Sequence, residues 1–388
     1  MSKFAEIDAD NINWRAAAAA IAAISVVGMA LGLGIPLISV LMEKQGHSAT
    51  IIGANTAIGG VAALVAAPFG PKIAQYLGLN RAMALMIIIV AGCMLSFNAF
   101  RTIEVWFVLR FVMNFAVTGL FLFSEFWISA AAPPSKRGFL LGVYVTFLSL
   151  GFAFGPFLFS QIGSEGSLAF YVGTGIILLA LIPVVLAWND GVKVEDGGVG
   201  GFLPYLWLVP TATAAVLVYG SVETGSFSLF PVYGARLAMP EADTALLLSA
   251  IGLGNVMLQI PLGYLSDSVK DRRLVMLGCA IVGFAGMAIL PFAIHNWWLA
   301  AAIMFIWGGV VAGLYTVGLA HLASRTPPAA LAQANAAFVF CYGVGMLMGP
   351  QAIGATMDIF GPNGFAYALA GFFILFIVLT TSRMVLRK

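Results

Sequence analysis

Apolar runs of about 20 residues or more recur along the whole chain, separated by short polar connections. Each run is long enough to cross a hydrocarbon layer about 30 Å thick as a helix. Hydrophobic residues make up 61% of the 388 residues and charged residues only 9%, whereas a water-soluble domain has about 25% charged residues. The runs are continuous rather than alternating, which excludes a membrane β-barrel. The sequence therefore predicts an all-α polytopic membrane protein.

We expect twelve membrane spans, and an even number places both ends of the chain on one side of the membrane. The expected spans are residues 16–42, 49–71, 80–100, 103–129, 138–162, 168–188, 204–233, 242–266, 273–293, 297–323, 331–357 and 364–384. The first is too long for the apolar core of a cleaved signal peptide. A polar, Gly-rich linker at 189–203 divides the chain into an N-terminal bundle, 1–188, and a C-terminal bundle, 204–388.

The positive charges indicate which side carries the ends. Most of the 18 Lys and Arg residues fall in connections on the side of the two termini. Lys44, Arg101 and Arg236 fall on the opposite side, and Arg110 lies within a span. The positive-inside rule therefore places both termini and the linker in the cytoplasm. The net charge of +2 gives no indication of a nucleic-acid partner.

The two halves repeat the same glycine and proline positions. The repeated set is Gly119, Pro134, Gly151, Gly155 and Pro156, which recur 194 positions later as Gly313, Pro328, Gly345, Gly349 and Pro350. Such a common offset indicates two six-helix parallel repeats with the same orientation.

The sequence contains no motif for a metal site, a cofactor site or an enzyme active site. Cys93, Cys279 and Cys341 lie far apart inside apolar runs, and no His residue has metal-ligand spacing. There is no phosphate-binding loop for ATP and no visible nucleophile–base pattern. We therefore expect no metal, no cofactor and no enzymatic activity.

A charged turn separates the eighth and ninth spans. It reads Gly263-Tyr-Leu-Ser-Asp267-Ser-Val-Lys-Asp-Arg272-Arg273, an order that resembles the loop signature of the major facilitator superfamily of transporters. We expect the Gly to allow close helix contact, Asp267 to sit at a neighbouring helix N-terminus and the arginines to anchor the turn. The resemblance implies a gating role for Asp267, Arg272 and Arg273.

The corresponding turn of the first half resembles the same signature less closely. It runs from Gly70 to Arg81, with Ala74 where Asp is usual. We expect Arg81 to contribute to gating, while the gate depends more than usual on Asp267. The family resemblance also implies the major facilitator fold and a substrate site near the membrane midplane, lined by spans 1, 4, 7 and 10.

A second family motif occurs in spans 5 and 11. Gly151-x-x-x-Gly155-Pro156 resembles the antiporter motif of the family, and Gly345-x-x-x-Gly349-Pro350 repeats it. Small residues four apart allow close helix contact. The motif is expected either to pack helices at the interface of the two halves or to influence the direction of transport.

Span 4 has a polar face that includes Arg110, Asn114 and Glu125. Arg110 resembles the family's span-4 arginine, although Asn114 replaces a usual Gly. A charge at this depth is costly and normally faces a cavity, so we expect both residues to bind substrate. Snorkelling of Arg110 is the alternative. Glu125 lies about 22 Å further along and is expected to bridge to Arg81 or Lys136 or, alternatively, to transfer protons.

Span 7 carries Tyr219, Glu223 and Ser226 on one face. Glu223 is the carboxylate furthest from both membrane edges, and its counterpart in the first half is close to Gly28, so it breaks the repeat. Burial favours a neutral carboxyl group, whereas a neighbouring Arg110 favours the ionised one. This competition suits a proton-coupling site. A fixed ion pair between Glu223 and Arg110 is the alternative.

The likeness to one branch of the family covers nearly the whole chain. The segments starting Glu125-Phe-Trp, Glu223-Thr-Gly, Gln259-Ile-Pro and Leu314-Tyr315-Thr resemble the bacterial YcaD-type transporters, a resemblance that implies no particular substrate. Further buried polar candidates for substrate binding are Asn255, Gln259 and Tyr315, alongside Tyr219.

These observations predict a secondary active transporter of the bacterial inner membrane. We expect a monomer in the lipid bilayer that moves a small molecule by alternating access and is coupled to protons. Export is the first hypothesis; proton-coupled uptake of a small anion or metabolite, with Arg110 holding a carboxylate, is the second. A non-transporting sensor is a third, although the short linker and tails leave no room for a signalling domain.

Overall fold

The computed structural model describes residues 12–131, 133, 136–189, 203–327 and 330–386. In this part of the chain all regular structure is helical. The helices are α1 (Trp14–Lys44), α2 (Ala49–Leu77), α3 (Leu79–Ala99), α4 (Ile103–Ala131), α5 (Arg137–Ile162), α6 (Leu168–Leu179), α7 (Leu181–Leu186), η1 (Leu203–Trp207), α8 (Pro210–Arg236), α9 (Glu241–Ser268), α10 (Arg272–Ala293), α11 (Trp297–Val311), α12 (Gly313–Arg325), α13 (Leu331–Phe360) and α14 (Gly364–Leu386).

Two membrane spans are each made of two consecutive helices. α6 and α7 form one span, and α11 and α12 form another. Pro183 explains the first interruption, because it lacks the N–H group that would bond to the carbonyl of Leu179. The described helices thus form twelve spans, as predicted. Eleven are long and apolar enough to cross a membrane, and the twelfth, α8, is long enough with 27 residues but more polar.

The predicted start of the seventh span at residue 204 is wrong. Residues Leu203–Trp207 form the short 3-10 helix η1, and α8 begins at Pro210, in its first turn. Proline is favoured at this position because its missing N–H has no partner within the helix there. The predicted linker 189–203 lies outside the described residues except at its two ends, so the domain limits stay a prediction.

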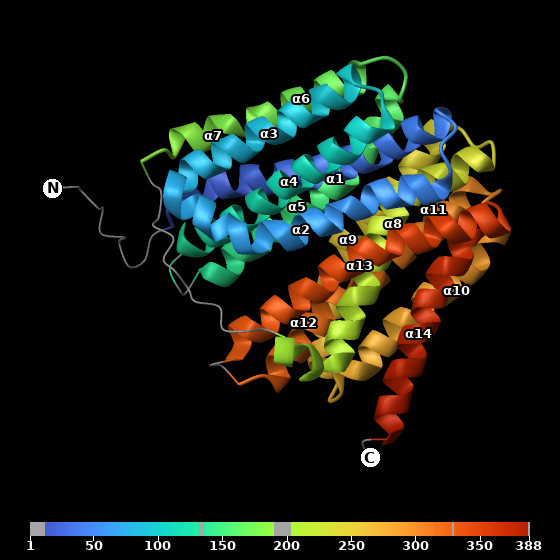
Figure 1. The fold of residues 1–388 in the computed structure, drawn as a ribbon. Helices are drawn as coiled ribbons and strands as arrows, with labels where there is room; N and C mark the ends of the chain where they lie inside the picture. The colour runs from blue at the N-terminus through green and yellow to red at the C-terminus, as the bar shows by residue number, and fades with distance from the viewer. Residues whose placement is uncertain (1–11, 132, 134–135, 190–202, 328–329, 387–388) are drawn as a thin grey trace.

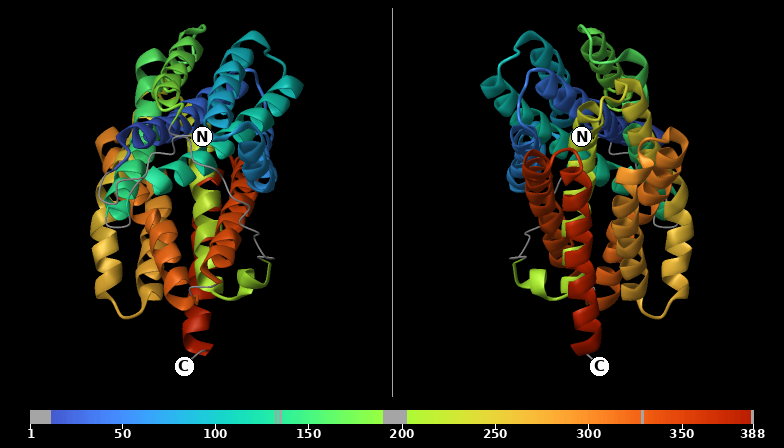
Figure 2. Two further views of the ribbon diagram at one scale, coloured as in Figure 1. Left: turned by 90° about the vertical axis from the view of Figure 1, so that its left-hand side faces the viewer. Right: turned by 90° about the vertical axis from the view of Figure 1, so that its right-hand side faces the viewer.

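The two halves of the molecule meet at one end and separate toward the other (Figure 1). The N half, α1–α7, is blue to green, and the C half, α8–α14, is yellow-green to red; two side views show the same division (Figure 2). We call the end where α1 begins and α14 ends the terminal face. The end where α1 finishes at Lys44 and α2 begins at Ala49 is the closed face.

Glycines bring the backbones of the two halves into direct contact near the closed face. A Cβ atom on Gly53 of α2 would lie 2.7 Å from the carbonyl carbon of Pro350 in α13. A Cβ on Gly252 of α9 would lie 2.6 Å from Cα of Ala153 in α5. No side chain fits at these distances, so glycine is required for the halves to pack this closely.

The glycines of the Gly-x-x-x-Gly-Pro motifs pack helices within each half. A Cβ on Gly151 would lie 2.8 Å from Cα of Gly28 in α1, and a Cβ on Gly349 would lie 2.6 Å from the carbonyl carbon of Ser221 in α8. The glycine pairs therefore pack α5 on α1 and α13 on α8. The expectation that the motif packs the two halves against each other is wrong for its glycines, whose small faces point into their own bundles. Pro350 of the second motif does lie at the interface of the halves, against Gly53 of α2.

Candidate functional site

Glu223 is the middle residue of α8 and accepts hydrogen bonds from two tyrosines. The hydroxyl of Tyr219, one turn earlier on α8, donates to its Oε1 atom at 2.7 Å. The hydroxyl of Tyr342, on α13, donates to its Oε2 atom at 2.6 Å. Both carboxyl oxygens thus have a donor, which is the arrangement that stabilises an ionised carboxylate.

A third tyrosine completes an aromatic cluster beside this carboxyl group. The ring of Tyr315, on α12, lies 5.7 Å from the ring of Tyr219 and 6.1 Å from that of Tyr342, measured between centroids. The Tyr219 and Tyr342 rings are 6.3 Å apart. Three of the twelve spans therefore contribute one tyrosine each.

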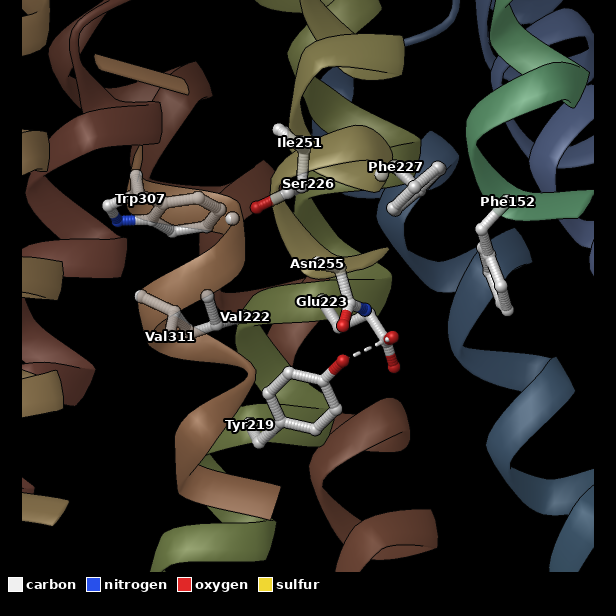
Figure 3. Close-up of a pocket in the computed structure, with 12 residues that line it drawn as sticks. Phe152, Tyr219, Val222, Glu223, Ser226, Phe227, Ile251, Asn255, Trp307 and Val311 are labelled. Carbon is white, nitrogen blue, oxygen red and sulfur yellow. Dashed lines mark hydrogen bonds between the residues drawn. The ribbon is translucent and has the colours of Figure 1, made fainter. Parts of the chain in front are cut away.

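A pocket opens next to Glu223 (Figure 3). Phe152 and Phe227 stand on one side of the view and Trp307 on the other, with Asn255 and the Tyr219–Glu223 pair below them. Phe152 belongs to α5, so the pocket has lining from both halves. Its full lining is Phe152, Tyr219, Val222, Glu223, Ser226, Phe227, Ile251, Gly252, Asn255, Trp307, Gly308 and Val311.

The other predicted polar residues of the C half are distributed unevenly around this pocket. Asn255 lines it, and Tyr315 belongs to the aromatic cluster. Gln259 lies one turn beyond Asn255 on α9; its amide nitrogen and oxygen are buried without a hydrogen-bond partner, and it is not part of the lining. Ser226 does line the pocket, and its buried hydroxyl has no partner.

Arg110 lies inside the N half rather than at the pocket. Its side chain is 1% exposed, its Nε atom donates to Oδ1 of Asn55 at 3.0 Å, and its guanidinium carbon lies 5.8 Å from the ring centre of Phe97. The low exposure contradicts snorkelling. Arg110 and Glu223 are both described, and they form no ion pair, so that alternative is wrong.

Two nitrogens of Arg110 have no partner. Both Nη atoms, and Nδ2 of Asn55, are buried without a hydrogen bond. Asn114, one turn further along α4, donates from Nδ2 to the backbone oxygen of Arg110 at 2.9 Å. The structure thus brings Arg110 and Asn114 together, but away from Tyr219 and Asn255. Their predicted role in substrate binding stays a prediction.

Glu125 lies within electrostatic range of one tyrosine from each half. Its side chain is exposed, and its carboxyl group interacts electrostatically with the hydroxyls of Tyr144 on α5 and Tyr315 on α12. Glu125 takes part in no ion pair with Arg81 or Lys136, so the expected bridge at the terminal face is wrong. The two acids of the predicted site, Glu223 and Glu125, therefore both act on Tyr315.

The charged turn after α9 is built differently from the expectation. Asp267 is 73% exposed and pairs with Arg272, whose Nη2 atom lies 2.9 Å from its Oδ1. Arg272 also donates to the backbone oxygen of Ala320 in α12 at 3.3 Å. A Cβ on Gly263 would meet nothing within 4 Å. The predicted close helix contact at Gly263 is therefore wrong, and the arginine anchors the turn to α12.

The acid at a helix N-terminus is Asp271 rather than Asp267. Asp271 caps α10 by accepting from the backbone N–H of Arg273, and its carboxylate pairs with the Arg273 guanidinium at 2.7 Å. These bonds hold the pKa of Asp271 below its usual range. The expectation for Asp267 failed because the aspartate four residues later is the one next to the helix start.

Arg81 is exposed and belongs to none of the ion pairs formed among the described residues. Gating by Arg81, Asp267, Arg272 and Arg273 stays a prediction, since the pairs of this face that the structure describes lie within the C half.

Charged residues at the closed face join the two halves directly. Arg236, at the end of α8, pairs with Glu43 of α1 at 2.9 Å and with Asp358 of α13 at 3.2 Å. Lys44 of α1 pairs with Glu241 of α9 at 2.9 Å. We call these five residues the closed-face clasp.

Asp358 also holds the beginning of α2 in the other half. Its two carboxylate oxygens accept from the backbone N–H groups of Ala49 and Thr50, at 3.0 and 2.8 Å, and from the hydroxyl of Thr50 at 2.7 Å. A helix N-terminus has unpaired N–H donors and a positive partial charge. Asp358, in the opposite half, accepts hydrogen bonds from these donors, and its negative charge is attracted by the positive partial charge.

Sequence reasoning missed Tyr342 and the clasp. The signal for the clasp was available, because five charges lie at the ends of spans on the side where charges are few. Tyr342 had no such signal: it is 119 positions from Glu223, and their contact depends on how α13 packs against α8.

Comparison with known proteins identifies the family. The sequence profile of the Major Facilitator Superfamily matches residues 20–237 and again residues 212–387, which together span nearly the whole chain. The chain belongs to the Major Facilitator Superfamily. It is therefore a secondary transporter and not an enzyme.

Bacterial relatives support the assignment over most of the transporter's length. The chain is 28% identical over 347 residues to the "Uncharacterized MFS-type transporter YfkF" of Bacillus subtilis, covering 87% of each chain. It is 22% identical over 302 residues to the "Uncharacterized MFS-type transporter YcaD" of Salmonella newport, covering 77% of this chain and 78% of that protein. The predicted similarity to YcaD-type proteins is thus found.

Solved transporters share the fold. The D323A mutant of the nucleoside transporter NupG superimposes with a TM-score of 0.81, at 13% identity, over 94% of this chain and 99% of that one. A bacterial homologue of the lysosomal transporter Spinster, in an inward-facing and occupied conformation, superimposes with a TM-score of 0.69, at 12% identity, over 94% of each chain. These likenesses confirm the major facilitator fold of two six-helix repeats.

Proposed function

We propose that this transporter exports a small organic molecule in exchange for protons across the bacterial inner membrane, by alternating access. The observation that carries the proposal is Glu223, an acid at the centre of α8 whose two oxygens are held by Tyr219 and Tyr342. An acid in the middle of a membrane span is costly and usually serves a transport or proton pathway. Tyr219, Asn255 and Tyr315 contact the substrate, and Glu125 passes protons toward the terminal face.

Exchange follows from the way Glu223 is bonded. Both carboxyl oxygens of Glu223 already accept a hydrogen bond, so a substrate that contacts this group binds it while Glu223 is ionised. A proton added to one oxygen removes that oxygen as an acceptor. Proton and substrate then bind alternately. When the proton gradient is directed inward, alternate binding drives the substrate outward.

Uptake of a small anion receives less support. That hypothesis needs Arg110 at the substrate site, but Arg110 is bonded to Asn55 inside the N half. None of the residues lining the described pocket is Lys, Arg or His. An anion entering this pocket would meet Glu223 without a compensating cation, which Coulomb repulsion disfavours strongly in a medium of low dielectric constant.

The positive charges support a cytoplasmic terminal face, because the turns of that face carry most of the Lys and Arg residues. The closed face is then external. We further propose that the halves are the segments 1–188 and 204–388, joined by 189–203, and that one chain is the working unit.

Glu223→Gln tests the coupling. A thermal-shift screen of the purified protein first identifies a transported compound, and flux is then measured in proteoliposomes. Gln resembles the protonated acid but cannot release a proton, and it should weaken substrate binding. Exchange of labelled for unlabelled substrate should therefore persist at saturating substrate concentration, while gradient-driven transport falls by about 10-fold or more even there.

Glu165→Gln is the matched control, because Glu165 lies exposed in the loop between α5 and α6; it should leave both fluxes unchanged. Gradient-driven transport by Glu223→Gln at the normal rate would contradict the proton role of Glu223. Loss of exchange even at saturating substrate, together with loss of gradient-driven transport, would place Glu223 in substrate binding alone.

A further inference from the structure

The pocket beside Glu223 combines negative charge with aromatic surface. Its lining contains one carboxylate, the aromatic side chains of Phe152, Phe227 and Trp307, and no Lys, Arg or His. Tyr219 contributes a further ring directly against Glu223. A cation is stabilised by a carboxylate through Coulomb attraction and by the face of an aromatic ring through its quadrupole.

A second carboxylate, Glu125, lies within electrostatic range of the same aromatic cluster. Tyr315 interacts electrostatically with both Glu223 of the C half and Glu125 of the N half. The two acids therefore approach the cluster from opposite halves of the transporter. Neither acid has an ion-pair partner within the part of the chain that the structure describes, and the hydrogen-bond donors to Glu223 are two uncharged tyrosine hydroxyls.

The buried cation of the N half does not compensate these acids. Arg110 is 1% exposed, bonds to Asn55 and lies over Phe97. A cationic ligand between the halves would supply the missing charge. An uncharged ligand would leave the two acids without a positive partner, and an anionic ligand would be repelled by them.

From this arrangement we infer that the substrate class is organic cations with an apolar, aromatic-sized body, bound between Glu223 and the rings of Phe152, Tyr219 and Trp307. The inference rests on the proposed function, which it makes more specific. Ser226 adds one polar contact: its hydroxyl is buried in the pocket without a partner and can accept a hydrogen bond from a protonated amine.

Tetraphenylphosphonium and tetraphenylborate provide a matched pair of probes. They have nearly the same size and shape and opposite charge, and neither can gain or lose a proton at neutral pH. Equilibrium dialysis of radiolabelled tetraphenylphosphonium with the full-length protein in lipid nanodiscs measures binding directly; empty nanodiscs correct for partition into lipid.

We expect saturable binding of tetraphenylphosphonium and, in a separate dialysis, no saturable binding of tetraphenylborate. Glu223→Gln should weaken the binding by about 10-fold or more, and Glu125→Gln by a smaller factor because Glu125 is more exposed. Glu223→Asp retains the charge and should restore part of the affinity, and Glu165→Gln should have no effect. Melting temperatures identify any variant that fails to fold, in which case the Asp variant decides.

Unchanged binding of tetraphenylphosphonium to Glu223→Gln, or equal binding of tetraphenylborate, would overturn the inference. A second measurement, the release of protons into a weakly buffered solution when tetraphenylphosphonium binds, distinguishes failure of this inference from failure of the proposed function. Cation binding that depends on Glu223 without proton release would retain the cation class and contradict proton exchange. Proton-coupled transport of a neutral or anionic compound, with no binding of tetraphenylphosphonium, would retain the exchange mechanism and overturn the cation class.

Discussion

Glu223, which is partly buried, and Arg110, which is fully buried, are in opposite situations. Each oxygen of Glu223 receives a tyrosine hydroxyl, whereas two nitrogens of Arg110 are buried with no acceptor. An incompletely paired buried cation lowers stability, so selection for stability alone would not retain it. We expect Arg110 to gain its missing partners in another state of the transport cycle.

Arg110→Met tests this interpretation. Met fills similar volume without charge, so the free energy of unfolding should stay unchanged or rise by about 1–3 kcal/mol, while transport falls. Melting temperature and flux are measured on the same preparation. Arg101→Met, at an exposed arginine that bonds to neighbouring Asn98, is the control. A lower melting temperature with normal transport would show that Arg110 is structural.

At the scale of single helices, the sequence determines how many spans form but not how they pair. A run of 20 apolar residues identifies a span by itself, and the offset between the halves fixes their common orientation. The contact between Tyr342 and Glu223 depends instead on the packing of α8 and α13. The clasp depends on which ends of the spans meet. The predicted place of Asp267 at a helix N-terminus is wrong because Asp271 lies closer to the start of α10.

Asp358→Asn tests how the clasp holds α2. The carboxylate accepts from the N–H groups of Ala49 and Thr50, and hydrogen bonds to a charged acceptor contribute about 1.5–3 kcal/mol. Hydrogen exchange at these two amides should therefore become about 10-fold faster, as measured by mass spectrometry of the α2 peptide. Asp267→Asn, at the terminal face, should leave them unchanged. Equal rates in wild type and Asp358→Asn would show that the contact does not protect α2.

For the whole molecule, the described state is closed at one face by both charge pairs and direct backbone contact. Gly53→Ala places a methyl group 2.7 Å from the Pro350 carbonyl carbon, well inside ordinary contact distance. The closed face should open more often, and transport should slow.

The opening is measured by the distance between spin labels at positions 47 and 295, in closed-face loops of the two halves. The three native cysteines are buried, which favours selective labelling of introduced cysteines. Gly278→Ala is the control, because a Cβ there meets nothing within 4 Å. An unchanged label distance in Gly53→Ala would mean that this contact does not limit closure.

The position of the clasp has a consequence for the surroundings of the transporter. Its side chains are about a fifth to a half exposed, and raising ionic strength from 0.1 to 1 M shortens the screening length from about 10 to 3 Å. Glu223 in the pocket lies deeper, where dissolved ions screen it less. Salt added on the closed-face side alone should therefore favour opening there without first weakening Glu223, so the balance between the two access states becomes sensitive to the salinity of one compartment.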